Sequence, residues 1–369
     1  MSSARHKRPR IWVAGLGETG PVGADLRSIP EMVLDAVEAA LDDAKLSFDA
    51  VDAVATASID LFDGLTASNV AVTEVVGAVM KPETRIAADG QCALAHAACQ
   101  IWAGAYDTVL VVAHGKPSMA PHHGLTAWAM DPIHVQPLGV DFLVCAGLVA
   151  QVLAGRDADA TSRWASTAAA RRCAAMTHGV AGACTSDEVL ASPAVATPLT
   201  EQMCAPLADA ACAVVLRRLD DGDESDSRVL LRGVGHDLDV HSLGDRDLTR
   251  WNGLERAYER ACAQADVSTP SAFGLFEPAC LYPHEEELFA AAIGLHPAHL
   301  RDSDRNEAPL LSPEGGSFAG ATPVAAGLSR LIASVRRLRS DPQLGRALAH
   351  GTWGPAGQGQ VVSILEATT

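Results

Sequence analysis

A repeated arrangement of turn, helix and strand constrains the fold of this 369-residue chain more than any other feature. In the first half, a Gly90-Gln91-Cys92 turn precedes an Ala-rich helical stretch, and a strand-like segment follows at 108–114. In the second half, a Gly315-Gly316 turn precedes a helical stretch, and the strand-like segment 360–366 closes the chain. Two halves of one architecture predict a pseudo-twofold axis with both helices buried centrally.

Short Val/Ile/Leu runs alternate with long Ala-rich stretches, a pattern typical of α/β proteins with a buried sheet. The hydrophobic content of 48% is sufficient for a large core. Strands are predicted at 11–15, 53–57, 108–114, 211–216, 229–234, 272–277 and 360–366. Helices are predicted at 31–44, 92–106, 160–178, 251–264, 283–293 and 316–339.

The charged segment 216–228, which contains Gly and Ser, reads as a linker between two halves. We therefore expect an N-terminal half at 1–218 and a C-terminal half at 228–369. Residues 116–200 are rich in His, Pro and Gly, and they are predicted to form a loop insertion that covers the site of the first half.

Charge and composition exclude several classes of protein. A net charge of −17 argues against binding to nucleic acid, which needs clustered Lys and Arg. The apolar runs fall short of the roughly 20 residues of a membrane span, and the N-terminus lacks the apolar length of a signal peptide. We therefore expect a cytoplasmic protein that neither crosses nor binds a membrane.

No metal site is predicted either. The nine cysteines contain no CxxC pair, and the segment 284–288 lacks the second histidine of a zinc-protease helix, so it reads as a solvated helix face. Four histidines lie between residues 114 and 134 without an accompanying set of acidic ligands. Among them, His134 is the best candidate to line a substrate pocket.

Three segments resemble the thiolase superfamily, specifically its sterol-carrier-protein-type thiolases and multi-component C-acyltransferases. Residues 89–115 are similar to the family's nucleophile turn, helix and following strand. Residues 206–216 resemble the segment that closes the first half, and residues 315–330 resemble the second-half Gly-His-Pro helix. The resemblance implies the thiolase fold, in which two pseudo-symmetric α/β halves form a five-layered α-β-α-β-α core. It also implies a coenzyme A thioester as substrate and no tightly bound cofactor.

The chain departs from the family at three of its motifs. Thr322 stands where most thiolases have the histidine of Gly-His-Pro, and Phe276-Glu277-Pro278-Ala279 replaces the Asn-Glu-Ala-Phe motif. His350 replaces the second catalytic cysteine. Cys92 as nucleophile with His350 as acid and base then resembles the dyad of the phloroglucinol acetyltransferases.

The residues themselves give this dyad a physical basis. Cys92 lies at a predicted helix start, where unpaired N–H groups and the helix dipole lower a thiol pKa. The backbone N–H groups of Cys92 and Thr352 are the predicted oxyanion donors, and Glu277 and Thr322 join His134 as pocket candidates. The alternatives are that Cys92 is an ordinary core thiol and that His350 caps a helix end. The sequence assigns no residues to coenzyme A, since it lacks a Walker A loop.

Three functions follow from the resemblance. The leading one is an acyltransferase that moves an acyl group from a coenzyme A thioester through Cys92 to a carbon acceptor. The alternatives are a thiolase-fold aldolase acting on a steroid or acyl-CoA side chain, and a catalytically silent scaffold subunit of an acyltransferase complex. We also expect a homodimer, because an exposed strand edge favours pairing with a second copy, and the resemblance allows for a small OB-fold partner.

Overall fold

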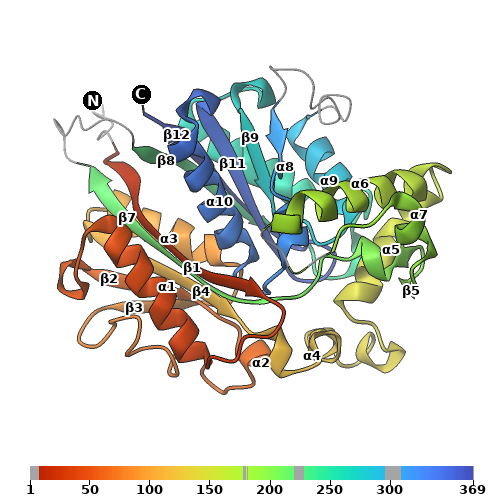
Figure 1. The fold of residues 1–369 in the computed structure, drawn as a ribbon, viewed down its shortest axis with the longest axis horizontal. Helices are drawn as coiled ribbons and strands as arrows, with labels where there is room; N and C mark the ends of the chain where they lie inside the picture. Colours follow the sequence, from red (N-terminus) through yellow and green to blue (C-terminus); the bar gives the residue numbers. More distant parts are fainter. Residues whose placement is uncertain (1–7, 178–179, 181, 220–227, 296–308, 369) are drawn as a thin grey trace.

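The computed structural model describes residues 8–177, 180, 182–219, 228–295 and 309–368 (Figure 1). The core of the predicted linker, residues 220–227, lies outside the described residues. The first half contributes the strands β1 (Arg10–Val22), β2 (Ala53–Ala57), β3 (Glu83–Ile86), β4 (Thr108–Gly115) and β7 (Asp209–Leu219). The second half contributes β8 (Val229–Leu238), β9 (Leu275–Pro278), β10 (Leu310–Leu311), β11 (Arg346–Trp353) and β12 (Gly359–Ala367). The principal helices of the halves are α1 (Ile29–Ala44), α2 (Asp60–Asp63), α3 (Gly90–Trp102), α8 (Asn252–Ala265), α9 (Pro283–Ile293) and α10 (Ala326–Ser340).

The strand pairing repeats between the halves. The first half has the order β1-β7-β4-β2-β3 and the second the order β8-β12-β11-β9-β10. In each half the first two pairings are antiparallel and the last two are parallel. An antiparallel contact of β1 with β8, Ile11 opposite Leu231 and Trp12 opposite Leu230, joins them into one ten-stranded sheet. The repeat predicted from the sequence is thus confirmed in the topology.

Alternating side chains define the layers of the core. On β4, Val111 packs in the central core with α3 and α10, whereas Val112 packs against α1. On β11, Ala349 packs in the same central core, whereas Leu348 packs with α8 and α9. The central helices α3 and α10 therefore lie between the two half-sheets, with α1 outside one and α8 outside the other (Figure 1). The five-layered α-β-α-β-α arrangement is confirmed.

Local sequence explains where the elements begin. Ser28 starts α1 with a capping box, in which its hydroxyl accepts the Glu31 N–H and the Glu31 carboxylate accepts the Ser28 N–H. Gly90 is the first residue of α3, at the point where the helices of the two halves meet. A Cβ atom at this position would lie only 2.9 Å from the Leu328 Cβ on α10. The close approach of α3 and α10 therefore requires glycine at this position.

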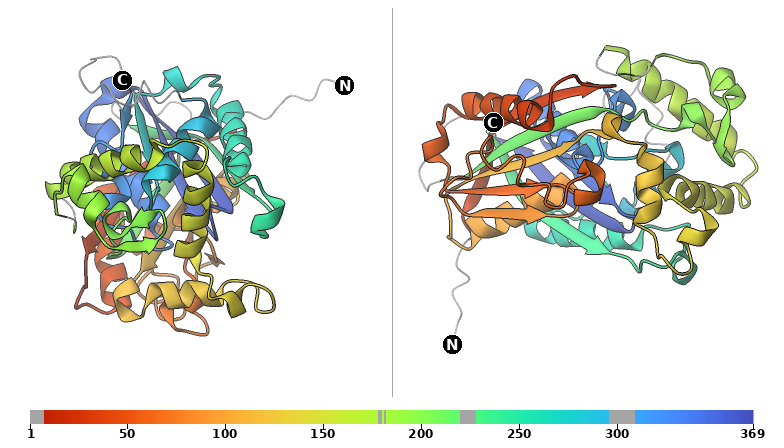
Figure 2. Two further views of the ribbon diagram at one scale, coloured as in Figure 1. Left: turned by 90° about the vertical axis from the view of Figure 1, so that its right-hand side faces the viewer. Right: turned by 90° about the horizontal axis from the view of Figure 1, so that it is seen from below.

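The insertion is largely helical rather than a loop, and it lies at one side of the two halves (Figure 2). It holds α4 (His122–Trp128), α5 (Phe142–Ala154), α6 (Ala160–Ala174) and α7 (Ser186–Ala191), with the short strands β5 (Ala194–Ala196) and β6 (Leu199–Thr200). Ala146 of α5 and Trp164 of α6 pack into a core of their own with Phe318 of the second half. The insertion forms a packed structure because the apolar side chains of α5 have a core to pack into. No helix among the described residues is long and apolar enough to cross a membrane.

Candidate functional site

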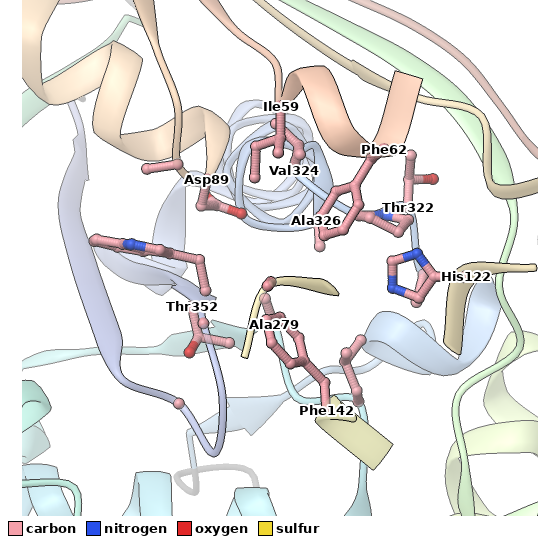
Figure 3. Close-up of a pocket in the computed structure, with 18 of the residues that line it drawn as sticks. Ile59, Phe62, Asp89, His122, Phe142, Ala279, Thr322, Val324, Ala326 and Thr352 are labelled. Carbon is pink, nitrogen blue, oxygen red and sulfur yellow. The ribbon is translucent and has the colours of Figure 1, made fainter. Parts of the chain in front are cut away.

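A pocket of about 220 Å³ lies at the carboxyl ends of β2, β3, β9 and β11 (Figure 3). This is the edge at which α/β sheets place ligands. Both halves and the insertion contribute to its walls, which are mostly apolar, with Phe62 and Phe142 among the larger side chains. The lining residues with polar groups include Asp89, His122, Tyr282, Glu285, Thr322 and Thr352.

Asp89 lies at the point where the amino ends of the two central helices meet. It is the N-cap of α3, and its Oδ1 accepts the Gln91 N–H at 2.9 Å. Its Oδ2 accepts the Gly327 N–H, from the first turn of α10, at 2.9 Å. Burial raises the pKa of Asp89 to about 7, even though both backbone hydrogen bonds favour the ionised form. A carboxyl group that lines the pocket can therefore exchange a proton near neutral pH.

Further hydrogen bonds between the halves hold Asp89 in place. The Gly90 N–H donates to the Val324 carbonyl at 2.7 Å, and the Gln91 Nε2 donates to the Gly327 carbonyl at 2.8 Å. Val324 has a φ of +70°, which is strained for a β-branched residue. Such strain persists only where the surrounding structure fixes the backbone, and Val324 itself lines the pocket.

A second buried carboxyl group, Glu285 of α9, reaches the pocket from the second half. Its Oε2 accepts the N–H groups of Leu281 and Tyr282, at 2.7 and 3.3 Å. Burial raises its pKa to about 7, despite these two donors. His122 of α4 enters from the insertion, where its ring packs on Phe62 with centroids 5.0 Å apart.

Cys92 lies one helical turn beyond Asp89 and is not among the residues that line the pocket. Its N–H, the predicted oxyanion donor, donates to the Asp89 carbonyl at 2.8 Å. Burial, with the nearby Asp89 carboxyl, raises the pKa of the Cys92 thiol well above its usual value. The expected lowering of the thiol pKa is therefore not found, because desolvation and the Asp89 carboxyl both raise it.

His350 lies within β11 rather than in a loop, and it is fully buried. Its Nε2 shares a 2.6 Å hydrogen bond with the Gln360 Oε1, and its ring packs against Trp251 and Phe289 of the outer layer. Burial lowers its pKa to about 4. Since Cys92 is on α3 in the central layer, the two residues lie on opposite faces of the half-sheet. The structure thus does not assemble the predicted dyad, and His350 does not cap a helix either.

Gln360 gives His350 an indirect connection to the pocket. The Gln360 Nε2 donates to the Gly357 carbonyl at 2.7 Å, and Gly357 lines the pocket from the turn between β11 and β12. Nδ1 of His350 has no hydrogen-bond partner among the described residues. His350 therefore supports one wall of the pocket from behind.

Of the three pocket candidates, Thr322 lines the cavity, and Glu277 and His134 do not; Thr352, the predicted oxyanion donor, also lines it. The hydroxyls of both threonines donate to backbone carbonyls, at 2.8 and 3.0 Å. Glu277 is buried in β9 and faces Arg330, with Nη1 and Oε2 3.4 Å apart. His134 exposes 82% of its side chain and pairs with an adjacent aspartate, so it is a surface residue.

Sequence reasoning missed Asp89, His122, Tyr282 and Glu285 as pocket residues. Asp before a helical stretch is an N-cap signal, and it could have placed Asp89 at the helix start, two residues before the predicted one, but it carries no information on the cavity. The segment 284–288 was predicted to be a solvated helix face, yet His284, Glu285 and Glu286 are buried. Within the described ranges, no group of three or more His, Cys, Asp or Glu side chains is arranged to hold a metal ion.

No protein-family model matches the chain, and no curated protein matches its sequence. Solved structures match along nearly its whole length. A monomeric SCP2-thiolase like protein type 1 from Mycobacterium smegmatis shares 19% identity at a TM-score of 0.74, covering 96% of this chain and 76% of that one. An Ltp2-ChsH2(DUF35) aldolase shares 18% identity at a TM-score of 0.76, covering 97% of this chain and 98% of that one. Human mitochondrial 3-ketoacyl-CoA thiolase shares 16% identity at a TM-score of 0.74, covering 98% and 99%.

These three similar proteins differ from one another in what their names describe, so similarity at this level of identity establishes only the architecture. None is a phloroglucinol acetyltransferase, and that branch stays a prediction. The protein has the thiolase fold that its sequence predicted.

Proposed function

We propose that the protein is a thiolase-like enzyme that binds an acyl-CoA thioester in this pocket and transfers protons through Asp89. The observation that carries the proposal is the placement of Asp89, a pocket-lining carboxyl group with a pKa of about 7. A general base or acid works best when its pKa is close to the working pH. The described lining residues include no cysteine, and among their polar groups Asp89 and Glu285 have a pKa of about 7.

The reaction best suited to such a group is aldol cleavage of a 3-hydroxyacyl thioester, or the reverse condensation. The Asp89 carboxylate takes the proton of the 3-hydroxyl group, and the bond between the α- and β-carbons breaks. The β-carbon becomes a carbonyl, and the electron pair passes to the thioester as an enolate. Asp89 then returns its proton to the α-carbon, so the step needs no oxidant, reductant or cofactor.

The surroundings of Asp89 favour the charged intermediate. The amino ends of α3 and α10 converge on this point, and helix amino ends stabilise negative charge nearby. The largely apolar walls exclude water, which strengthens such interactions. Glu285, the other pocket carboxyl group with a pKa of about 7, is the second candidate for the proton transfer.

Acyl transfer through Cys92 is the reaction that the sequence favours, and it needs an accessible thiolate. The raised pKa of Cys92 and its place outside the pocket count against it, whereas its half-buried side chain leaves the sulfur partly accessible. The similarity to an aldolase adds weight to the cleavage reaction without deciding it. The proposal keeps a coenzyme A thioester as substrate, whereas the cytoplasmic location and a small OB-fold partner stay predictions.

Cleavage of 3-hydroxyacyl-CoA substrates tests this proposal, with the carbonyl product trapped as a hydrazone. Asp89→Asn is expected to slow cleavage by roughly 10²–10⁴-fold, the usual contribution of a general base. Cys92→Ala is the matched control on the same helix and is expected to retain activity, because removing a small thiol disturbs packing little. The opposite result, loss of activity with Cys92→Ala alone, would restore the acyl-enzyme. No turnover by the wild type with any thioester would support a scaffold subunit.

A further inference from the structure

A second hollow lies directly behind one wall of the pocket. It has a volume of about 770 Å³, is more open than the pocket, and its walls include Arg172, Glu188, Glu201 and Cys204. Among the residues that the structure describes, only Leu207 lines both cavities. Within the described part of the chain, the apolar pocket and a more open hollow of mixed apolar and charged lining therefore meet at a single side chain.

Apart from Leu207, the wall between the cavities consists of two hydrogen-bonded layers of backbone. Ala205 and Pro206 line the hollow, and they bond to residues that line the pocket: the Ala205 N–H donates to the Leu281 carbonyl, and the Ala321 N–H donates to the Pro206 carbonyl, both at 2.8 Å. The Ala208 N–H donates back to the Ala321 carbonyl at 2.9 Å. These bonds fix the backbone on each side of Leu207.

The side chain of Leu207 differs from a core residue in its surroundings. It is only partly buried, and it has a cavity on either side, so a change of rotamer or of size does not meet a close-packed interior. The backbone around Leu207 is thus held by hydrogen bonds, whereas its side chain is loosely surrounded. The size and rotamer of this side chain therefore determine whether the two cavities connect.

We propose that Leu207 is the gate that sets the length of the acyl group, and that the outer hollow receives the distal end of a long acyl chain. This inference rests on the proposed binding of an acyl thioester in the pocket. The near part of the acyl group contacts the apolar pocket, and the distal part passes Leu207 into the hollow, whose walls include the apolar Ala191, Pro193 and Pro206 beside its charged side chains. Leu207 is a specificity-determining residue and not a catalytic one.

Binding and turnover of a series of straight-chain acyl-CoA and 3-hydroxyacyl-CoA thioesters from C4 to C16 test the gate. Leu207→Ala is expected to improve affinity and kcat/KM for the long members by roughly tenfold relative to C4, which corresponds to burial of about two further methylene groups. Leu207→Phe is expected to shift the preference the other way. Leu61→Ala, which enlarges the pocket but does not adjoin the hollow, is the matched control and is expected to affect short and long members alike.

The outcomes separate the two proposals. If the wild type binds no acyl-CoA of any length, the proposed function fails and the gate with it. If the wild type binds the series, and correctly folded Leu207→Ala and Leu207→Phe change all lengths by one factor, only the gate is refuted.

Discussion

Asp89→Asn is expected to flatten the dependence of stability on pH. Burial raises the pKa of Asp89 from 3.8 to about 7, a difference of about 3 units, which is worth about 4 kcal/mol at ~1.36 kcal/mol per unit. Between these two pKa values the folded protein holds a proton that the unfolded chain releases. The free energy of unfolding therefore falls as the pH rises through this range, by up to about 4 kcal/mol from Asp89 alone.

Urea denaturation at pH 5, 6, 7 and 8 measures this effect. The wild type is expected to lose stability relative to Asp89→Asn from pH 5 to about 7, and the difference between them levels off above that pH. Both proteins share two further contributions: the raised pKa of Glu277 and Glu285, about 7, adds to the loss, and the pKa of His284 and His350, lowered by burial, opposes it. Asp60→Asn is the matched control, since hydrogen bonds from Arg85 and Ser68 lower the pKa of Asp60 to about 2, so it stays ionised across this range.

Parallel slopes for the wild type and Asp89→Asn would refute the reasoning. Such a result would mean that Asp89 stays ionised throughout, held by the two helix amino ends as an ordinary double N-cap. The proposed proton transfer would then lose its physical basis.

Three further predictions follow from the placement of the other residues. Iodoacetamide is expected to label the exposed Cys99 well before Cys92, as read by peptide mass spectrometry, and faster labelling of Cys92 would show an activated thiolate. His350→Phe is expected to lower the free energy of unfolding by about 1–3 kcal/mol and to raise KM more than it lowers kcat, because Gln360 loses its hydrogen-bond partner behind the pocket wall. A stable variant with a lowered kcat would instead indicate a catalytic histidine. Sedimentation is expected to show a homodimer, since β3 is an unpaired edge of the sheet, and a monomer at micromolar concentration would contradict this.

The layered fold could be predicted from the sequence because it depends on patterns that extend over many residues. The helix predicted at 283–293 and the strand predicted at 108–114 match α9 and β4 closely, since Pro283 and Gly294 bound the helix and the strand is a nearly continuous apolar run. The insertion was predicted less well, because His, Pro and Gly at its start concealed the apolar helix at 142–154.

The site depends on differences of one to three residues, which sequence patterns do not fix. Asp89 at the start of α3 reaches the pocket, and Cys92, one turn later, does not. A correct prediction of the site therefore needed the first residue of this helix to be known without error. His350 and Thr352 are two residues apart on β11 and so share a face of the strand, and only their positions along it decide that Thr352, nearer the carboxyl end, lines the pocket while His350 is fully covered. The pKa values follow from burial, which depends on contacts between the two halves.

The most direct test of the central claim is mass spectrometry of both the thioester and the protein after incubation with acyl-CoA in D₂O. If Asp89 moves protons at the α-carbon, the wild type is expected to incorporate deuterium there. Asp89→Asn is expected to incorporate far less, and the intact protein should show no acyl adduct. An acyl adduct that disappears in Cys92→Ala, without deuterium in the thioester, would contradict this account and establish the acyl-enzyme instead.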